Sequence, residues 1–124
     1  MPWEGDEPPF GFSSGGQPWL PIPFEWAPLS VEAQLEDPNS ILCLYRLAIE
    51  LRKTHPAFSG PTLEWYGAPA GCFAYRRKES GLICVLNTAS APVPMPPGEL
   101  LLASGPLADP KRLPPDTAAW LVTS

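Results

Sequence analysis

The sequence predicts an α+β chain, in which a long loop and one helix precede a small antiparallel β-sandwich. Three observations lead to this fold class. Residues 1–37 are rich in proline, glycine and aromatic residues, and residues 38–54 carry apolar side chains at helical spacing. From residue 62 onward, short apolar runs bounded by Gly and Pro replace that spacing. We therefore expect a helix over 38–54 and β-strands over about 62–124.

The composition argues against several classes of protein. A length of 124 residues suits one domain, and 19 prolines disfavour long helices. Residues 1–60 hold eight acids and three bases, and residues 61–124 hold five of each, so we expect no nucleic acid partner. No apolar run approaches the ~18 residues that cross a membrane. The first residues are acidic, which argues against a signal peptide and favours a cytoplasmic protein.

The first 37 residues raise a question, because large aromatic side chains occur where no helix or strand is expected. These aromatic residues are Trp3, Phe10, Phe12, Trp19 and Trp26. Seven prolines and several glycines in the same stretch predict extended chain and turns. Disordered segments are usually poor in aromatic residues. We therefore expect this long loop to be ordered by packing onto something large.

The helix over 38–54 has a start signal, an apolar face and a stop signal. Asp37 and Pro38 predict its start, as an N-cap acid followed by Pro at the first helical position. Arg52 and Lys53 stand in the last turn, where cations suit the helix dipole. His55-Pro56 ends the helix. One broad face is apolar, and the rest of the chain looks too small to cover it.

The strands are predicted by short apolar runs between turn residues. Cys72–Arg77 and Leu82–Asn87 flank the turn 78–81 and predict a hairpin, with Tyr75 opposite Cys84 and Phe73 opposite Leu86. Further strands are expected within 62–66, 99–104 and 118–124. Short, regularly spaced strands of this kind are typical of an antiparallel sandwich.

The cysteines and the single histidine do not suggest a metal site. Cys43, Cys72 and Cys84 are an odd number at wide spacing, no CxxC pair occurs, and His55 is the only histidine. We expect three reduced, buried thiols, with a disulfide as the alternative. No pattern indicates a cofactor.

Several short motifs follow one another along the chain, namely Met1-Pro2-Trp3, Gly11-Phe12-Ser13, Pro18-Trp19-Leu20, Val31 to Gln34, and the helical stretch 37–52. Their order resembles the C-terminal portion of the glycoside hydrolase family 13 α-glucosidases, of the actinobacterial type. This group includes oligo-1,6-glucosidases and trehalose-synthase-like enzymes. Met1-Pro2-Trp3 looks like the end of the family's Arg-x-Pro-Met-x-Trp motif, and Gly11-Phe12-Ser13 looks like its Gly-Phe-Ser/Thr.

The resemblance implies a division of the chain into two parts. Residues 1–58 would be the end of a (β/α)8 barrel, namely the loop after strand 8 and helix 8, and residues 59–124 would be the all-β domain that follows it. Trp3, Phe10, Phe12 and Trp19 would then have lost packing partners that lie upstream of Met1. The missing N-terminal barrel portion is the implied partner, and small α-linked gluco-oligosaccharides are the implied substrates of the intact enzyme.

The resemblance also implies that this chain has no catalytic residues. The family hydrolyses α-glucosidic bonds with retention, through a carboxylate nucleophile, a Glu acid/base and a second supporting Asp. These residues stand on earlier barrel strands, and none of them maps onto this sequence. We therefore assign no catalytic, cofactor-binding or metal-binding residue and expect the chain alone to be inactive.

Two sets of side chains near the start of the chain, the acids and the tryptophans, each have a functional and a structural interpretation. Glu4, Asp6 and Glu7 could act as an acid/base pair, because glycosidase carboxyls stand about 5–9.5 Å apart, but a solvated acidic loop is the favoured interpretation. The indoles of Trp3, Trp19 and Trp26 could stack on a sugar. Packing against a barrel is favoured for them, because large aromatic side chains mostly contribute burial.

For the remaining candidate residues, a structural role is the favoured interpretation. His55 is expected at the surface or as a cap, Arg76–Lys78 as a solvated face, and the run PVPMPP over 92–97 as a connection between strands. The same run could instead bind an SH3-type groove. The alternatives to the glucosidase hypothesis are therefore a non-catalytic carbohydrate-binding β module and a Pro-rich interaction module.

Overall fold

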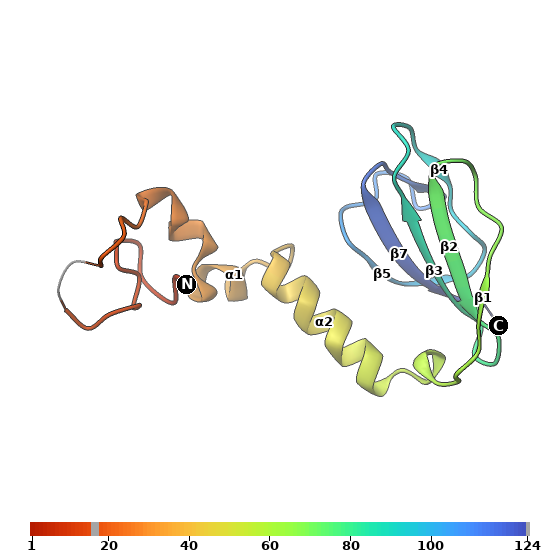
Figure 1. Ribbon diagram of the computed structural model, residues 1–124, viewed down its shortest axis with the longest axis horizontal. Coiled ribbons are helices and arrows are strands. Elements are labelled where there is room, and N and C mark those ends of the chain that lie inside the picture. The colour runs from red at the N-terminus through yellow and green to blue at the C-terminus, as the bar shows by residue number, and fades with distance from the viewer. Residues whose placement is uncertain (16–17, 124) are drawn as a thin grey trace. The chain divides into compact units, whose positions relative to one another are not determined.

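A computed structural model describes residues 1–15 and 18–123 of the chain (Figure 1). The chain divides into two compact units, Met1–Leu47 and Ala48–Ser124. The first unit holds the leading loop, two short helices and the start of a long helix. The second holds the end of that long helix and all of the strands.

The leading loop folds back on itself. The N–H groups of Trp3 and Glu4 both donate to the carbonyl of Phe10, at N–O distances of 2.7 and 3.1 Å. Gly5 makes the reversal possible with a φ of +78°, a left-handed conformation that costs glycine little. The Phe10 side chain is only 1% exposed. The expectation that Phe10 lacks packing partners is therefore wrong, because the described residues of this chain alone bury its side chain.

Two short helices follow within the stretch that the sequence predicts as loop. A 3₁₀ helix, η1, covers Phe24–Leu29, and α1 covers Val31–Glu36. The hydroxyl of Ser30 caps α1 by accepting from the N–H of Ala33 at 3.2 Å. The prediction of an uninterrupted loop to residue 37 is wrong, because it gave weight to the prolines and overlooked this cap.

The long helix, α2, covers Ile41–Thr54 and begins three residues later than predicted. Ser40 is its cap, since the Ser40 hydroxyl accepts from the N–H of Cys43 at 3.1 Å. Asp37 instead closes a turn, in which its carboxylate accepts from the N–H of Asn39 at 2.9 Å. No residue of α2 is buried, and Arg52 and Lys53 stand in the last turn as expected.

Seven antiparallel strands lie among the described residues of the second unit, together with the end of α2. They are β1 (Leu63–Trp65), β2 (Cys72–Arg77), β3 (Leu82–Asn87), β4 (Val93–Pro94), β5 (Glu99–Ala103), β6 (Arg112–Leu113) and β7 (Thr117–Val122). Five of them form one sheet in the order β1-β2-β3-β7-β5, as Figure 1 shows. The predicted hairpin is confirmed, with Tyr75 paired to Cys84 and Phe73 paired to Leu86.

The second layer of this domain is small. β4 and β6 form a two-stranded sheet, and Leu113 of β6 is completely buried in the core. The five-stranded sheet supplies the rest of this core, which consists of Ala74, Ile83, Val85, Ala119 and Leu121. The run 92–97 is expected as a connection between strands, and this is wrong for Val93 and Pro94, which form the two-residue strand β4 outside the five-stranded sheet.

Asn87 joins the two layers. Its side chain is 0% exposed, and its Nδ2 donates to the carbonyls of Ala91 and Leu113, both at 3.0 Å. Its Oδ1 accepts from the N–H of Ala89 at 2.9 Å and from the thiol of Cys72 at 3.4 Å. One amide therefore fixes the turn after β3 and the backbone of β6 together.

Candidate functional site

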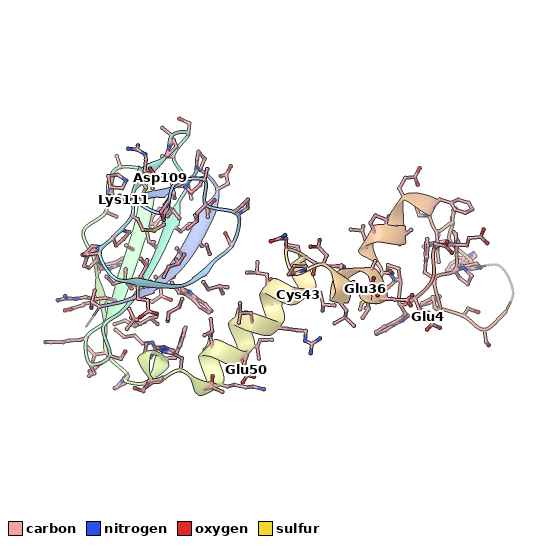
Figure 2. All side chains as sticks on the ribbon, turned by 180° about the vertical axis from the view of Figure 1, so that it is seen from behind. Glu4, Glu36, Cys43, Glu50, Asp109 and Lys111 are labelled. Carbon is pink, nitrogen blue, oxygen red and sulfur yellow. The ribbon has the colours of Figure 1, made fainter. Side chains whose placement is uncertain are left out.

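Two hollows lined by described residues of the first unit are candidate sites. The first has a volume of about 460 Å³ and is lined by Gly5, Asp6, Ala27, Pro28, Ser30, Glu32, Ala33 and Glu36. A hydrogen bond fixes the Glu32 carboxylate, whose Oε2 accepts from the N–H of Gly5 at 2.7 Å. Figure 2 marks Glu36 at the end of α1 and Glu4 in the leading loop. The hollow is acidic, and its carboxylates are exposed to water.

The second hollow is apolar and has a volume of about 520 Å³. Its walls come from the loop on either side of residues 16–17, and they consist of Glu7, Pro8, Pro9, Pro18, Trp19, Leu20, Pro21, Ile22 and Phe24. Trp19 is 98% exposed, so its ring presents nearly all of its surface. A planar apolar ring such as that of Trp19 can pack on the C–H face of a sugar. A carboxylate beside it, here that of Glu7, can accept hydrogen bonds from the hydroxyl groups of the sugar.

The three acids near the start do not converge on one site. Asp6 lines the acidic hollow, Glu7 lines the apolar hollow, and Glu4 lines neither. All three side chains are exposed. A pair of carboxyls for acid/base work needs one substrate between them, and this placement does not supply it.

The three tryptophans are also separated. Trp19 lines the apolar hollow, whereas Trp3 and Trp26 belong to neither hollow and are about half exposed. The N–H of Glu32 donates to the Trp3 carbonyl at 2.9 Å, so Trp3 has a backbone role where the loop meets α1. A continuous aromatic platform is therefore absent from these residues.

The remaining candidates have structural roles. The Nδ1 of His55 accepts from the N–H of Ala57 at 3.2 Å and caps the 3₁₀ helix η2 (Pro56–Phe58), as expected. Arg76 pairs with Glu64, and the guanidinium of Arg77 donates to the carbonyl of Gly60. The prediction of a solvated face over 76–78 is thus right for Arg76 and Lys78, which are exposed, whereas Arg77 is half-buried.

The Pro-rich run 92–97 does not present itself as a ligand for another protein. Val93 and Met95 pack against the hydrophobic core. The N–H of Met95 donates to the carbonyl of Lys111 at 2.9 Å, so the run is part of the second layer. Figure 2 marks Lys111 and its neighbour Asp109, whose carboxylate accepts from the Lys111 N–H at 2.8 Å.

The cysteines are free thiols, but they are half-buried rather than buried. Cys43, marked in Figure 2, donates to the carbonyl of Gln34 at 3.4 Å. Burial and the hydrogen bond with Cys84 raise the pKa of Tyr75. A hydrogen bond from the Thr62 hydroxyl lowers the pKa of Glu79. Both shifts belong to the sheet and its turns in the second unit, whereas the two hollows are lined by residues of the first.

Neither a metal-binding cluster nor a membrane-spanning helix occurs among the described residues. No group of three or more His, Cys, Asp or Glu side chains in that part of the chain could hold a metal ion. Over residues 1–15 and 18–123, no helix combines the length and the apolar character that crossing a lipid bilayer requires.

Sequence reasoning missed two features that the structure makes prominent. One is Asn87, whose position at the end of a predicted strand gave no sign of its burial. The other is the exposed apolar side of the sheet, which includes Trp65 and Phe73. Both depend on which strands pair, and β3 pairs with a strand some thirty residues further along the chain.

Comparisons with known proteins point in one direction. Residues 67–120 match the family described as Domain of unknown function (DUF3459). An oligo-1,6-glucosidase of Parageobacillus thermoglucosidasius is 42% identical over 55 residues, which are 44% of this chain and 9% of the relative. A probable α-glucosidase of Rhizobium meliloti is 34% identical over 89 residues, which are 70% of this chain and 16% of the relative.

Solved structures resemble nearly the whole chain. The α-glucosyl transfer enzyme XgtA matches 98% of this chain with 28% identity and a TM-score of 0.66, over 25% of its own length. The isomaltulose synthase of Klebsiella sp. LX3 matches 97% with a TM-score of 0.75 and 23% identity, a likeness of fold, over 24% of its own length. The chain thus spans 9–16% of the curated relatives it matches and about a quarter of these structures.

Proposed function

We propose that this chain is the C-terminal portion of a glycoside hydrolase family 13 α-glucosidase, of the actinobacterial type expected from its motifs. The two curated relatives described above are an oligo-1,6-glucosidase and a probable α-glucosidase, and they support this family. The match to DUF3459 covers the sheet, and the small antiparallel domain fits the portion that follows the barrel in that family.

The observation that carries the proposal is the extent of the structural likeness. XgtA matches 98% of the chain, so the likeness includes the leading loop and α2 as well as the strands. In the proposed assignment, residues 1–58 are the loop after the eighth barrel strand and the eighth helix, and residues 59–124 are the all-β domain. The unburied α2 supports this, because an outer barrel helix buries one face on strands that this chain does not contain.

The chemistry of the whole enzyme is then retaining hydrolysis of α-glucosidic bonds in small oligosaccharides, and the chain alone is inactive. Retention requires two carboxyls about 5–5.5 Å apart on either side of the bond. The leading loop does not supply such a pair, because Asp6 and Glu7 line different hollows and Glu4 lines neither. All three side chains are exposed. The free thiols are compatible with a cytoplasmic location, which is part of the proposal.

Two measurements test this proposal. The coding sequence upstream of Met1 should contain an in-frame Arg-x-Pro that completes the family motif, whereas a stop codon and a ribosome-binding site directly upstream would favour an accessory module. The purified chain should not hydrolyse p-nitrophenyl α-glucoside. Turnover that is abolished by Glu4→Gln, Asp6→Asn or Glu7→Gln would contradict the proposal, because it would place the catalytic acids in the leading loop.

A non-catalytic sugar-binding module is the second candidate, favoured by the exposure of Trp19 beside the apolar hollow. Calorimetric titration with isomaltose and maltotriose separates the two candidates. Binding by the isolated chain that Trp19→Ala abolishes would favour the module. Trp26→Ala is the matched control, because Trp26 lies outside that hollow.

A further inference from the structure

Four oxidisable side chains form one row across the five-stranded sheet. The row crosses the neighbouring strands β1, β2, β3 and β7 (Figure 1) and consists, in order, of Trp65, Tyr75, Cys84 and Trp120. Each of them is the direct cross-strand partner of the next. Such partners point to the same face of a sheet, with Cβ atoms about 4.5–5.5 Å apart. An indole, a phenol, a thiol and a second indole therefore lie side by side, and we call these four residues the redox row.

The phenol and the thiol in the middle of the redox row are in contact. Burial and a hydrogen bond with the Cys84 thiol raise the pKa of Tyr75. A phenol and a thiol that share a hydrogen bond can exchange a hydrogen atom, because the proton has only to cross that bond while the electron moves between the two groups. A tyrosyl radical at Tyr75 is therefore placed to take the hydrogen atom of the Cys84 thiol.

The two ends of the redox row differ in exposure. The side chain of Trp65 is 83% exposed. Trp120 is half-buried, and the ring of Phe58 meets its ring edge to face at a centroid distance of 4.9 Å. The thiol of Cys84, between the two ends, is half-buried as well. An oxidant in solution therefore meets the indole of Trp65 before it meets the thiol.

The other two cysteines supply a comparison within the same chain. Cys43 and Cys72 are free and half-buried, as Cys84 is. Cys43 lies in α2 and Cys72 pairs with Asn87, so both stand outside the redox row. Exposure alone predicts similar oxidation of the three thiols, and a preference for Cys84 would have to come from its neighbours in the row.

We propose that the redox row transfers a radical from the exposed indole of Trp65 through Tyr75 to Cys84, whose thiol is the group finally modified. The oxidant is a one-electron oxidant in solution, of the class of the carbonate radical anion. The path needs no active site, so it is independent of the proposed function. Oxidation then ends as a sulfenic acid, which other thiols can reduce, instead of as a permanently altered indole.

The transfer balances in atoms and electrons at each step. The first carbonate radical anion takes one electron from Trp65 and becomes carbonate, and the indole N–H proton goes to water. The neutral Trp65 radical takes the hydrogen atom of the Tyr75 O–H, which restores the indole. The Tyr75 radical takes the hydrogen atom of the Cys84 S–H, which restores the phenol. A second carbonate radical anion removes one electron from the sulfur, and water adds to the sulfur with loss of a proton, which gives the sulfenic acid.

The test exposes the 124-residue chain to carbonate radical anions, generated by photolysis of a carbonato-cobalt(III) complex, in the presence of dimedone. Dimedone labels sulfenic acids, and peptide mass spectrometry measures the label on each cysteine and the oxygen added to Trp65. We expect about fivefold more label on Cys84 than on Cys43 or Cys72, because Cys84 alone of the three belongs to the redox row. Equal labelling of the three cysteines overturns the proposal.

A matched pair of variants tests the middle of the row. Tyr75→Phe interrupts the path, because phenylalanine has no O–H group to give. We expect it to lower the label on Cys84 about fivefold and to raise the oxygen added to Trp65. Tyr66→Phe is the control, since the Tyr66 side chain packs against the core, and it should change neither quantity. An unchanged label on Cys84 in Tyr75→Phe refutes the path through the phenol.

Hydrogen peroxide separates radical transfer from a change in the exposure of the thiol. It oxidises a thiolate directly by two electrons, so Tyr75→Phe should leave the label on Cys84 unchanged with this oxidant. An equal fall with both oxidants would assign the effect to exposure and overturns the proposal. Trp65→Phe keeps a ring at the exposed end and should lower the label about threefold with the radical anion but not with peroxide. A full label in Trp65→Phe would show that oxidation does not enter at this indole and also overturns the proposal.

Discussion

Replacing Asn87 by Ala should destabilise the β domain more than any single change at its surface. The substitution removes two donors from Nδ2 and one strong acceptor from Oδ1, all three used by backbone groups. The bond to the Leu113 carbonyl is buried, whereas the bond to the Ala91 carbonyl is only partly buried. Water can therefore replace the second bond more easily than the first.

The magnitude follows from these partners. A buried polar group left without a partner costs about 1–3 kcal/mol. One fully buried carbonyl and two partly buried backbone groups give a loss of about 2–4 kcal/mol in the free energy of unfolding. Against a total stability of about 5–15 kcal/mol for a domain, this is a large fraction. Urea denaturation, monitored by far-ultraviolet circular dichroism, measures this loss in the free energy of unfolding.

The matched control is Thr88→Val, at the neighbouring exposed position. The Thr88 hydroxyl donates to the carbonyl of Gly71 at 2.7 Å, but the bond faces water, so its loss should cost less than about 1 kcal/mol. Equal losses for Asn87→Ala and Thr88→Val would refute the argument from burial. Asn87→Asp should be at least as harmful at pH 7, because a carboxylate would face two carbonyls without a proton to donate.

Three further changes have defined outcomes. Phe58→Ala and Trp120→Ala should each destabilise the chain, and a double-mutant cycle should give a coupling of about 0.5–1.5 kcal/mol, whereas zero coupling would deny the edge-to-face contact. The pKa of Tyr75 is raised in the folded state, mainly by burial. The neutral phenol therefore stabilises the folded state fully below the unfolded-state pKa, and this stabilisation disappears as the pH rises through the folded-state pKa. Unfolding experiments above pH 10 should thus show a steeper loss of stability for the wild type than for Tyr75→Phe, and parallel curves would contradict this. Ser40→Ala should cost about 1 kcal/mol and shorten α2 in circular dichroism, whereas Asn39→Ala should leave the helix unchanged.

The sequence predicted the features that depend on local spacing. The alternation of side chains in β2 and β3, with a four-residue connection, was enough to place Tyr75 opposite Cys84. The end of α2 followed from Arg52, Lys53 and the His55-Pro56 stop. These signals are contained in a few adjacent residues, so no knowledge of distant contacts is required.

The features that the sequence did not predict depend on distant contacts or on caps. β4 and β6 are two-residue strands, which are too short to produce an alternating pattern. Phe10 is buried in a stretch without regular secondary structure, where no spacing rule indicates which aromatic side chain will be enclosed. Ser40 competes with Asp37 as the cap of α2, and only the helix itself identifies which of them is used.

The strand order has a consequence for how this protein is made. β7 stands between β3 and β5, and it is the last strand in the order of synthesis. A ribosome therefore completes the β2–β3 hairpin well before the strand that closes the sheet, and β3 offers an open edge throughout that interval. Contacts between segments far apart in sequence also form slowly. Changes within Thr117–Val122 should accordingly lower the yield of soluble protein from living cells more than purified samples indicate, since a nascent chain with that open edge is exposed to aggregation and proteases.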